Sequence, residues 1–341
     1  MARYVIIGAG AVGASLAAQF ALSGIDYVLV GRGDQIAHIT QHGLNYRRPE
    51  GTRQITLNAF DLSDPQDLTA NDILLLTVKS QDAASALAFW SWRSVSGSKS
   101  PASAILPIVT FQNGLSTESV ALRTFANVYG ASILTPARFT ETGTVVVGGV
   151  PQPGIVTLGR FPKGHDKDSQ QIAADLTSAG YLAEATGDIS RWKAAKLLHN
   201  VRNVLELFDG PEPLRETLST AIVEEARLVL SAAGYSFAAP SERTIDISHW
   251  RIAPDSGIVP GQQSTWQSFT RGASSEVDFL NGEIVLLGRL HGIASPYNKA
   301  VQTLAGVLAQ KGAFTEPLRL EAIFSLLDEE DPSQPHLSVG A

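Results

Sequence analysis

The first residues with evident chemistry are the glycines of the run Gly8-Ala9-Gly10-Ala11-Val12-Gly13. The run follows an apolar stretch of strand composition, 4–7, and precedes a helix-compatible stretch that ends at Gly24. In this context the first glycine permits a tight turn, the second lets the backbone approach a pyrophosphate, and the third lets helix and strand pack closely. The pyrophosphate would lie on the free N–H groups of the helix N-terminus. A dinucleotide site is therefore expected, against the alternative of an ordinary glycine-rich turn.

The second strand-like run, 26–30, indicates which dinucleotide this is, because it is followed by Gly31 and Arg32. A site selective for NAD has an acidic side chain at this point for the ribose 2′-OH. A guanidinium can instead pair a 2′-phosphate through two hydrogen bonds. NADP(H) is therefore the expected cofactor. The competing interpretation gives Asp34 to a ribose hydroxyl and leaves Arg32 on a solvated loop.

Polar residues also follow two later strand-like runs. Lys79 comes after the run 73–78, and Gln112-Asn113-Gly114 comes after the run 105–111. Open α/β sheets bind ligands outside the carboxyl ends of their strands, so these residues are expected to converge with the glycine loop. Each could also be an ordinary turn, since Asn-Gly is common in loops.

A second group of polar residues lies in the predicted helix 191–207. Lys196, Asn200 and Asn203 are spaced by four and three residues, so they share one helix face. Asparagine disfavours a helix interior, and two in line with a lysine suggest a site; the alternative is a solvent-facing polar stripe. Lys193 falls near the same face, and spacing does not choose between the two lysines.

A third group is Ser264 with Gln267, followed by Glu276 at the start of a predicted helix. A carboxylate at that position could form part of the site. It could equally do no more than complement the helix dipole.

The elements that position these groups divide the chain in two. Short apolar runs alternate with helical stretches in the N-terminal half, which is typical of a doubly wound parallel sheet. Two runs, Thr144–Val147 and Ile155–Leu158, are expected to pair antiparallel at its far edge. From residue 188 the sequence is mostly helical, with helices expected at 191–207, 213–233, 274–291 and 298–310. We expect a dinucleotide-binding domain at 1–187, a helical domain at 188–328 and a flexible tail at 329–341.

Composition limits the class of protein. The chain has 341 residues, 44% of them hydrophobic and 17% charged, and a net charge of −7. These values are typical of a globular protein, and the acidic balance argues against a nucleic-acid partner. Cysteine is absent, which excludes disulfides, a thiolate nucleophile and cysteine-based metal sites; no metal is expected. With no membrane-length apolar run and a first strand too early for a signal peptide, a cytoplasmic location without membrane association is expected.

Taken together, the residues resemble those of the ketopantoate reductase (2-dehydropantoate 2-reductase) family over nearly the whole chain. The matching motifs are GAGAVG at 8–13, the arginine at Arg32, V-K at 78–79, Q-N-G at 112–114, K-L-x-x-N at 196–200, S-x-x-Q at 264–267, E-x-D-F-x-N-G at 276–282 and H-G-I-x-x-P-x-N at 291–298.

The resemblance implies an α/β fold: an N-terminal Rossmann domain, a C-terminal all-helical domain similar to that of 6-phosphogluconate dehydrogenase, and an active site in the cleft between them. It also implies NADPH-dependent reduction of a 2-oxo acid, 2-dehydropantoate to (R)-pantoate, within pantothenate biosynthesis. Hydride reaches the 2-keto carbon and a lysine protonates the resulting alkoxide. Aligning K-L-x-x-N selects Lys196 as that general acid and leaves Lys193 dispensable. Asn113, Asn200 and Ser264 would contact substrate, while Arg32, Lys79, Asn113 and Glu276 would serve the cofactor or orient the catalytic group.

Two positions depart from the family's pattern. The second helix asparagine stands at Asn203, with Val204 where the family has asparagine, and one residue turns a helical side chain by about 100°. Ser268 replaces an aspartate that usually follows S-x-x-Q. Three functions therefore stay open: ketopantoate reduction, with Asn203 at the substrate's hydroxyl end; reduction of another 2-oxo acid or imine; and a non-catalytic NADP-binding sensor. The oligomeric state is also open, with a homodimer as the candidate.

Overall fold

The structure is a computed structural model that describes residues 2–254, 256–257, 264–270, 275–312 and 316–330. Its contacts divide the chain into two compact units. The first unit comprises Met1–Gln112, Ser116–Lys193 and Ala239–Ile258, and the second comprises Asn113–Leu115, Ala194–Ala238 and Val259–Ala341. The expected boundary after residue 187 thus falls close to the contact boundary after Lys193, and a later segment, Ala239–Ile258, packs with the first unit.

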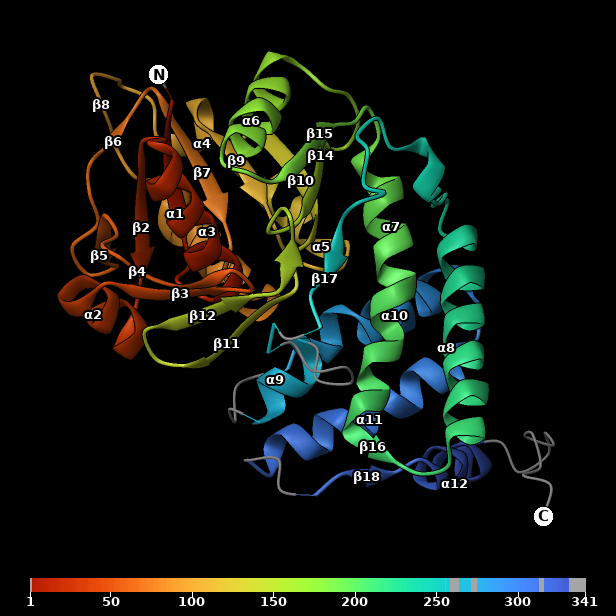
Figure 1. Cartoon of the computed structure of the whole chain (residues 1–341). Coiled ribbons are helices and arrows are strands. Elements are labelled where there is room, and N and C mark those ends of the chain that lie inside the picture. The colour runs from red at the N-terminus through yellow and green to blue at the C-terminus, as the bar shows by residue number, and fades with distance from the viewer. Residues whose placement is uncertain (1, 255, 258–263, 271–274, 313–315, 331–341) are drawn as a thin grey trace. The chain divides into compact units, whose positions relative to one another are not determined.

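The first unit is built on a mixed, mainly parallel sheet with the strand order β15-β14-β10-β9-β7-β1-β2-β5 (Figure 1). The strands from β10 to β5 run parallel, while β14 runs antiparallel to β10 and parallel to β15. Their bounds are β1 Arg3–Ile7, β2 Tyr27–Gly31, β5 Ala59–Asp61, β7 Asp72–Leu76, β9 Pro107–Thr110, β10 Asn127–Leu134, β14 Ile155–Arg160 and β15 Leu182–Ala185.

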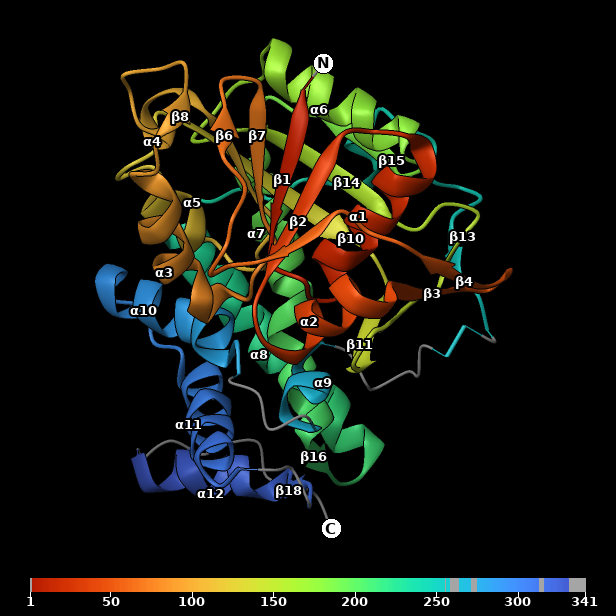
Figure 2. The same ribbon diagram turned by 90° about the vertical axis from the view of Figure 1, so that its left-hand side faces the viewer.

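Helices cover both faces of this sheet, which explains why its strands are apolar throughout. Alternate residues of β1 belong to different cores: Tyr4 and Ile6 pack with α1, α2 and α6, whereas Val5 and Ile7 pack with α3, α4 and α5. Figure 2 shows β7, β1 and β2 side by side between these layers. The helices are α1 Ala11–Ser23, α2 Gly33–His42, α3 Ser80–Ser91, α4 Ala102–Ile105, α5 Ser116–Ala121 and α6 Lys167–Ser178.

A second sheet, with the order β11-β12-β3-β4, packs against α1. Its strands are β3 Leu44–Arg48, β4 Gly51–Ile55, β11 Ala137–Glu141 and β12 Thr144–Val147. The expected antiparallel pairing of 144–147 with 155–158 is therefore wrong. β12 pairs with β11 and β3, while β14 pairs with β10 and β15. Both runs are buried and apolar, and neither pattern specifies its partner.

Short strands complete the first unit and begin the second. β6 (Leu68–Thr69) pairs with β8 (Val95–Ser96). β13 (Gly149–Val150) pairs with β17 (Arg251–Ile252), and the short 3₁₀ helix η2 covers Pro240–Glu242. In the second unit, β16 (Phe208–Asp209) pairs with β18 (Leu318–Arg319).

The second unit is helical, as expected. In α8, Leu218, Ile222 and Val229 recur at helical spacing and are buried in its core. Gly292 ends α10 in the left-handed conformation that glycine permits. The elements, of which α7 begins in the first unit, are α7 Ile189–Asn200, η1 Val201–Leu207, α8 Glu212–Ala232, α9 Ser264–Thr270, η3 Val277–Phe279, α10 Asn281–His291, α11 Pro296–Gln310 and α12 Glu321–Glu330. Among the helices of the described residues, none has the length and apolarity needed to span a bilayer.

Candidate active site

The glycine loop joins β1 to α1 in the conformation that the motif requires. Gly8 has φ +118°, and a Cβ there would lie 2.9 Å from the Val78 side chain. A Cβ on Gly13 would lie 1.9 Å from the carbonyl oxygen of Gly8. Both positions therefore exclude any side chain, and they bring the helix against the strand.

Gly10, by contrast, faces open space. A Cβ built on it would meet no described heavy atom within 4 Å. Gly10 is the N-cap of α1, whose first turn carries no acidic residue, and no described side chain caps this N-terminus. The N–H groups of Ala11, Val12 and Gly13 are thus suited to an anion. Ala9 closes the loop against β2, since a Cβ on Gly31 would lie 2.8 Å from the Ala9 Cβ. These residues fit the pyrophosphate of a dinucleotide.

The carboxyl ends of four neighbouring parallel strands carry the other residues expected around the cofactor. In register, Ile7 of β1 pairs with both Val30 of β2 and Leu76 of β7, and Leu76 pairs with Thr110 of β9. Arg32, Lys79 and Asn113 follow β2, β7 and β9 in the chain. The side-chain amide of Gln112 donates to the carbonyls of Leu76 (2.9 Å) and Val78 (2.8 Å), which ties two strand ends together.

Arg32 lies at the N-cap of α2, directly after β2. Its side chain is 70% exposed, and its guanidinium donates to Asp82 of α3 at 2.8 Å. An ion pair this exposed contributes little to stability, so Arg32 can exchange Asp82 for another anion at small cost. Asp34, the alternative ribose ligand, is exposed in the first turn of α2. Lys79 is half-buried at the N-cap of α3.

The expected helix 191–207 changes pitch halfway. It is α-helical to Asn200 and continues as the 3₁₀ helix η1. Three residues turn through about 360° in a 3₁₀ helix, against about 300° in an α-helix. Seen along the helix axis, Asn203 therefore points in the same direction as Asn200. In an uninterrupted α-helix, residue 204 would point about 40° away from Asn200, so Asn203 lies close to the direction in which the family's asparagine would point. The change of pitch compensates for the one-residue displacement of the asparagine.

Asn200 and Asn203 are both buried, with 6% of each residue exposed. No hydrogen bond joins either side-chain amide to another described residue, and the amide atoms are not among those shut off from solvent. Two amides on one helix face that have no protein partner and remain open to solvent are suited to bind a ligand. Lys196, one turn before Asn200, is half-buried.

Lys193 is distinguished from Lys196 by its surroundings in the first unit. It is 4% exposed and forms an ion pair with Glu118, itself 1% exposed. Its ammonium also donates to the main-chain carbonyl of Gln112 at 3.0 Å, and Thr110 donates to the same carboxylate at 2.5 Å. Lys193 is therefore a structural tie between α7, α5 and the end of β9. Sequence spacing gave no signal for this role.

His199 and Arg202 form a pair beside this face. Arg202 donates to His199 Nδ1 at 2.8 Å, so the proton of neutral His199 is on Nε2. His199 is exposed, but partial desolvation lowers its pKa, and the charges of Arg202 and Lys196 lower it further. His199 is thus neutral near pH 7 and adds no charge beside Lys196.

The third predicted group is described in part. Ser264 is the first residue of α9, but its side chain lies outside the described part of the chain. Glu276 is buried at the N-cap of η3. Gly114 is fixed in the same unit, because φ is +86° and a Cβ would lie 2.4 Å from the Phe279 carbonyl oxygen. The tail expected from residue 329 lies, from 331 onward, outside the described residues.

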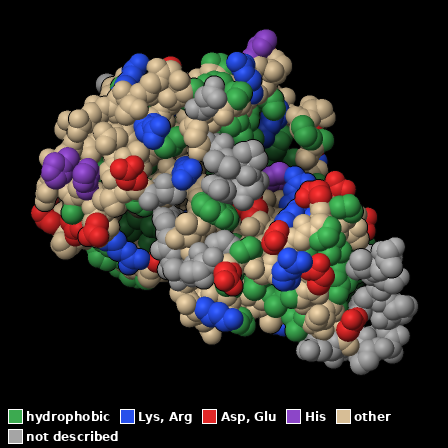
Figure 3. Space-filling model, turned by 60° about the horizontal axis from the view of Figure 1, so that its bottom comes forward, with side chains coloured by type: hydrophobic (Ala, Val, Ile, Leu, Met, Phe, Trp, Pro, Cys, Tyr) green, Lys and Arg blue, Asp and Glu red, His purple; other side chains and the backbone are tan. Residues whose placement is uncertain are grey.

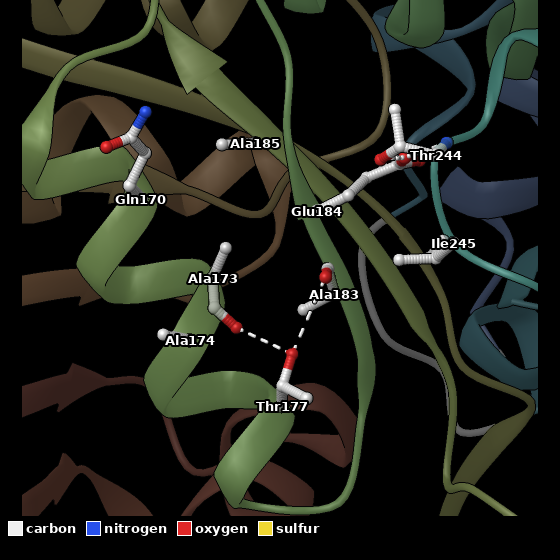
Figure 4. Close-up of a pocket in the computed structure, with 9 residues that line it drawn as sticks. All are labelled: Gln170, Ala173, Ala174, Thr177, Ala183, Glu184, Ala185, Thr244 and Ile245. Atoms are coloured by element: carbon white, nitrogen blue, oxygen red, sulfur yellow. Dashed lines mark hydrogen bonds between the residues drawn. The ribbon is translucent and has the colours of Figure 1, made fainter.

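A shallow depression of about 390 Å³ elsewhere in the first unit holds none of these residues (Figure 4). One of its lining residues, Glu184, already accepts hydrogen bonds from Thr157, Arg243 and Thr244 at 2.8–3.0 Å. The carboxylate is satisfied and fastens the segment Ala239–Ile258. On the face shown in Figure 3, acidic and basic side chains are interspersed rather than gathered by sign.

Comparisons with known proteins agree with the resemblance read from the motifs. The family model "Ketopantoate reductase PanE/ApbA" matches residues 4–163, and "Ketopantoate reductase PanE/ApbA C terminal" matches residues 192–309. The 2-dehydropantoate 2-reductase of Archaeoglobus fulgidus is 28% identical and that of Pyrococcus horikoshii 26%. These alignments cover 89% of this chain and 96% and 99% of the relatives, respectively.

Solved structures show the same fold. A PanE/ApbA family ketopantoate reductase from Ralstonia eutropha matches with a TM-score of 0.73 at 23% identity. D-mandelate dehydrogenase with NADH and anilino(oxo)acetate matches with a TM-score of 0.74 at 19% identity. Each match covers 91% of this chain and 99% of the other. The expected fold class is confirmed. The first family model covers the part of the chain with the parallel sheet, and the second covers most of the helical part. Because the two models together span most of the chain, the chain belongs to the ketopantoate reductase family of oxidoreductases.

Proposed function

We propose that the chain reduces 2-dehydropantoate to (R)-pantoate with NADPH, and that Lys196 is the proton donor. The support for the substrate is the family and the curated relatives of 23–28% identity, all named 2-dehydropantoate 2-reductase. The support for the dinucleotide is the open Gly10 position at the N-terminus of α1, which no described side chain caps.

Arg32 supports the choice of NADPH. Its exposed guanidinium follows β2, where an NAD-selective site has a carboxylate. In the proposed complex it pairs the 2′-phosphate through two hydrogen bonds and releases Asp82. Lys79, half-buried at the next strand end, adds a second positive charge for the cofactor.

The protein's role in the reaction is to stabilise the negative charge that develops on the substrate oxygen. NADPH, when bound, supplies the hydride that adds to C2 of the 2-oxo acid while the electrons of the C=O bond move to oxygen. Lys196 stabilises the resulting alkoxide through its ammonium and gives it a proton, which completes the hydroxyl group. The neutral amine then regains its proton from solvent.

The observation that carries the proposal concerns Asn200 and Asn203, two largely buried residues in line with Lys196. Their side-chain amides have no hydrogen-bond partner among the described residues and remain open to solvent. We propose that Asn200 binds the 2-oxo acid near the reacting carbonyl and that Asn203 binds the hydroxyl end. The oxygen atoms of a 2-oxo acid can form hydrogen bonds with both amides, whereas an apolar ligand would cover them without replacing their hydrogen bonds to water. Asn113 and Ser264 are proposed as further substrate contacts, and Glu276 as the residue that orients the catalytic group.

The test is a turnover screen of 2-oxo acids with NADPH, monitored by loss of nicotinamide absorbance. We expect 2-dehydropantoate to have the highest kcat/KM of the 2-oxo acids tested. Ser268 stands where the family usually has aspartate, so another 2-oxo acid or an imine is the second candidate, and a different best substrate would establish it. Tight NADPH binding without turnover of any compound would instead indicate a sensor.

A further inference from the structure

The 3₁₀ helix η1 is unusual because it covers seven residues, Val201–Leu207. Such helices rarely exceed three or four residues, since their hydrogen bonds are poorly aligned. A long 3₁₀ segment that continues an α-helix therefore needs support from outside. The second unit supplies it as side-chain donors aimed at the carbonyl groups of η1 and its end.

The start of η1 is held by an asparagine pair. Asn281, at the N-terminus of α10, donates from Nδ2 to the Val201 carbonyl at 2.9 Å and to Asn298 Oδ1 at 3.1 Å. Both asparagines are fully buried, at 1% and 0% exposure. The bond to Val201 falls on the first residue after the α-helical part of the chain, where the pitch changes.

The asparagine pair is itself anchored to α8. Asn298 donates from Nδ2 to the Ile222 carbonyl (3.0 Å) and to Glu225 (2.9 Å). The Glu225 carboxylate also accepts the main-chain N–H groups of Tyr297 and Asn298, both at 2.9 Å, and so caps α11. A single buried network thus fixes η1 relative to α8, α10 and α11.

The end of η1 has its own support. Arg215 of α8 donates to the carbonyls of Leu205 (2.5 Å) and Phe208 (2.8 Å). With both ends held, the three-residue turn is maintained over the whole segment. This is the conformation that aligns Asn203 with Asn200; an α-helical segment would turn Asn203 away by about 60°.

We propose that Asn281 and Asn298 are positioning residues of the reductase: they hold η1 in its 3₁₀ pitch and thereby direct the Asn203 amide toward the substrate. The inference rests on the proposed function, because Asn203 is taken as a substrate contact. Asn281 and Asn298 do not touch substrate themselves. They act through the Val201 carbonyl.

The test is a double-mutant cycle on KM for 2-dehydropantoate. Asn203→Ala removes one hydrogen bond and should raise KM about five- to tenfold. Asn281→Ala should raise KM to a similar extent with NADPH affinity unchanged. Because Asn281 acts through Asn203, the double variant should have the KM of Asn203→Ala alone. Additive effects of the two substitutions, or an unchanged KM in Asn281→Ala, would overturn the proposal.

A matched control separates positioning from general loss of stability. Ile323→Ala removes a fully buried side chain of α12 in the same unit and should lower the melting temperature without changing KM. If Ile323→Ala raises KM as Asn281→Ala does, the positioning role is refuted. Asn298→Ser is a milder second variant should Asn281→Ala not fold, and the same rise in KM is expected of it.

Hydrogen exchange gives a readout that does not depend on the substrate. The amides of 201–207 should exchange faster in Asn281→Ala than in wild type, while those of α1 and β1 stay protected. If wild type turns over no 2-oxo acid, the proposed function fails, and exchange alone decides the structural part. Unchanged protection of 201–207 would then overturn this inference.

Discussion

Lys193 and Glu118 form a buried ion pair in the first unit, although the two residues are 75 positions apart in the chain. The same ammonium donates to the Gln112 carbonyl, immediately before Asn113. Lys196, one turn further along α7, is half-buried and belongs to the second unit. Two lysines that spacing cannot distinguish therefore have separate roles, one structural and one proposed as catalytic.

Lys196→Ala should abolish most turnover and leave the fold intact. Loss of a general acid costs about 10²–10⁴-fold in rate, and NADPH affinity should stay near the wild-type value because the lysine acts on the substrate oxygen. Steady-state kinetics and cofactor titration measure the two effects. An active Lys196→Ala enzyme would contradict the assignment of the proton donor.

Lys193→Met should destabilise the protein by about 3–5 kcal/mol, because it leaves the Glu118 carboxylate buried without its partner. The expectation from the sequence that Lys193 is dispensable is therefore revised for stability. The control is the double variant Lys193→Met/Glu118→Gln, which removes both charges and should recover much of the loss. Urea unfolding measures both. Equal stability of the single and double variants would show that the charge is not the cause.

Arg32→Ala should weaken NADPH binding by about 1.5–3 kcal/mol, the range for a hydrogen bond to a charged group, and leave NADH binding almost unchanged. Asp82→Asn is the matched variant, since it removes the carboxylate that pairs Arg32. It should bind NADPH at least as tightly as wild type. Isothermal titration with both dinucleotides tests this, and equal affinity of wild type for NADH and NADPH would refute the role of Arg32.

Gly10→Ala should impair binding of the cofactor, whereas Gly13→Ala should lower the stability of the fold. Gly10 has φ −77° and open space around its Cβ position, so alanine should fold normally but obstruct the pyrophosphate. In Gly13→Ala the new Cβ would collide with the Gly8 carbonyl oxygen, and the melting temperature should fall. Thermal unfolding with and without NADPH separates the two. A stabilising shift by NADPH as large in Gly10→Ala as in wild type would contradict a pyrophosphate at this loop.

Stability at acid pH should depend on Asp166, the N-cap of α6. Burial acts to raise its pKa, but hydrogen bonds from Ser169, Tyr129 and Arg160 outweigh burial, and the pKa lies below its usual value of 3.8. In acid the unfolded state therefore binds the proton first. The stabilisation by Asp166 is fully present above about pH 4 and is lost as the pH falls through the lowered folded pKa.

Asp166→Asn is the variant that tests this dependence. The difference in free energy of unfolding between wild type and variant should be constant from about pH 7 to 5 and shrink below about pH 4. Urea unfolding at a series of pH values measures it. A difference that does not change with pH would show that the charge of Asp166 has no part in stability.

Features encoded by neighbouring residues could be predicted from the sequence. The glycine loop, the helix that follows it and the end of that helix at Gly24 depend on local sterics, and the structure contains them as expected. The predicted pairing of Thr144–Val147 with Ile155–Leu158 is wrong, because a buried apolar strand can pair with several different neighbours. Which strands pair depends on contacts between segments far apart in the chain, and the hydrophobic pattern of a single strand carries no information about them.

The candidate site shows the same limit. Lys196, Asn200 and Asn203 could be grouped by spacing, but the 3₁₀ pitch that aligns the asparagines depends on Asn281 and Arg215, which lie on other helices. The residue types at 200–207 do not distinguish the two helix forms. Likewise, Lys193 is buried because Glu118 compensates its charge from far away in the sequence.

The return of Ala239–Ile258 to the first unit has a consequence for how this protein could be divided or recombined. Arg243 lies over the Trp192 ring at 4.5 Å and pairs with Glu184, and Trp250 donates to the Gln152 carbonyl. A fragment that stopped at Lys193 would expose that ring and leave the Glu184 carboxylate without its cation. The first unit therefore cannot be transferred to another protein as one continuous stretch of the gene, because its last segment is encoded after the first helices of the second unit.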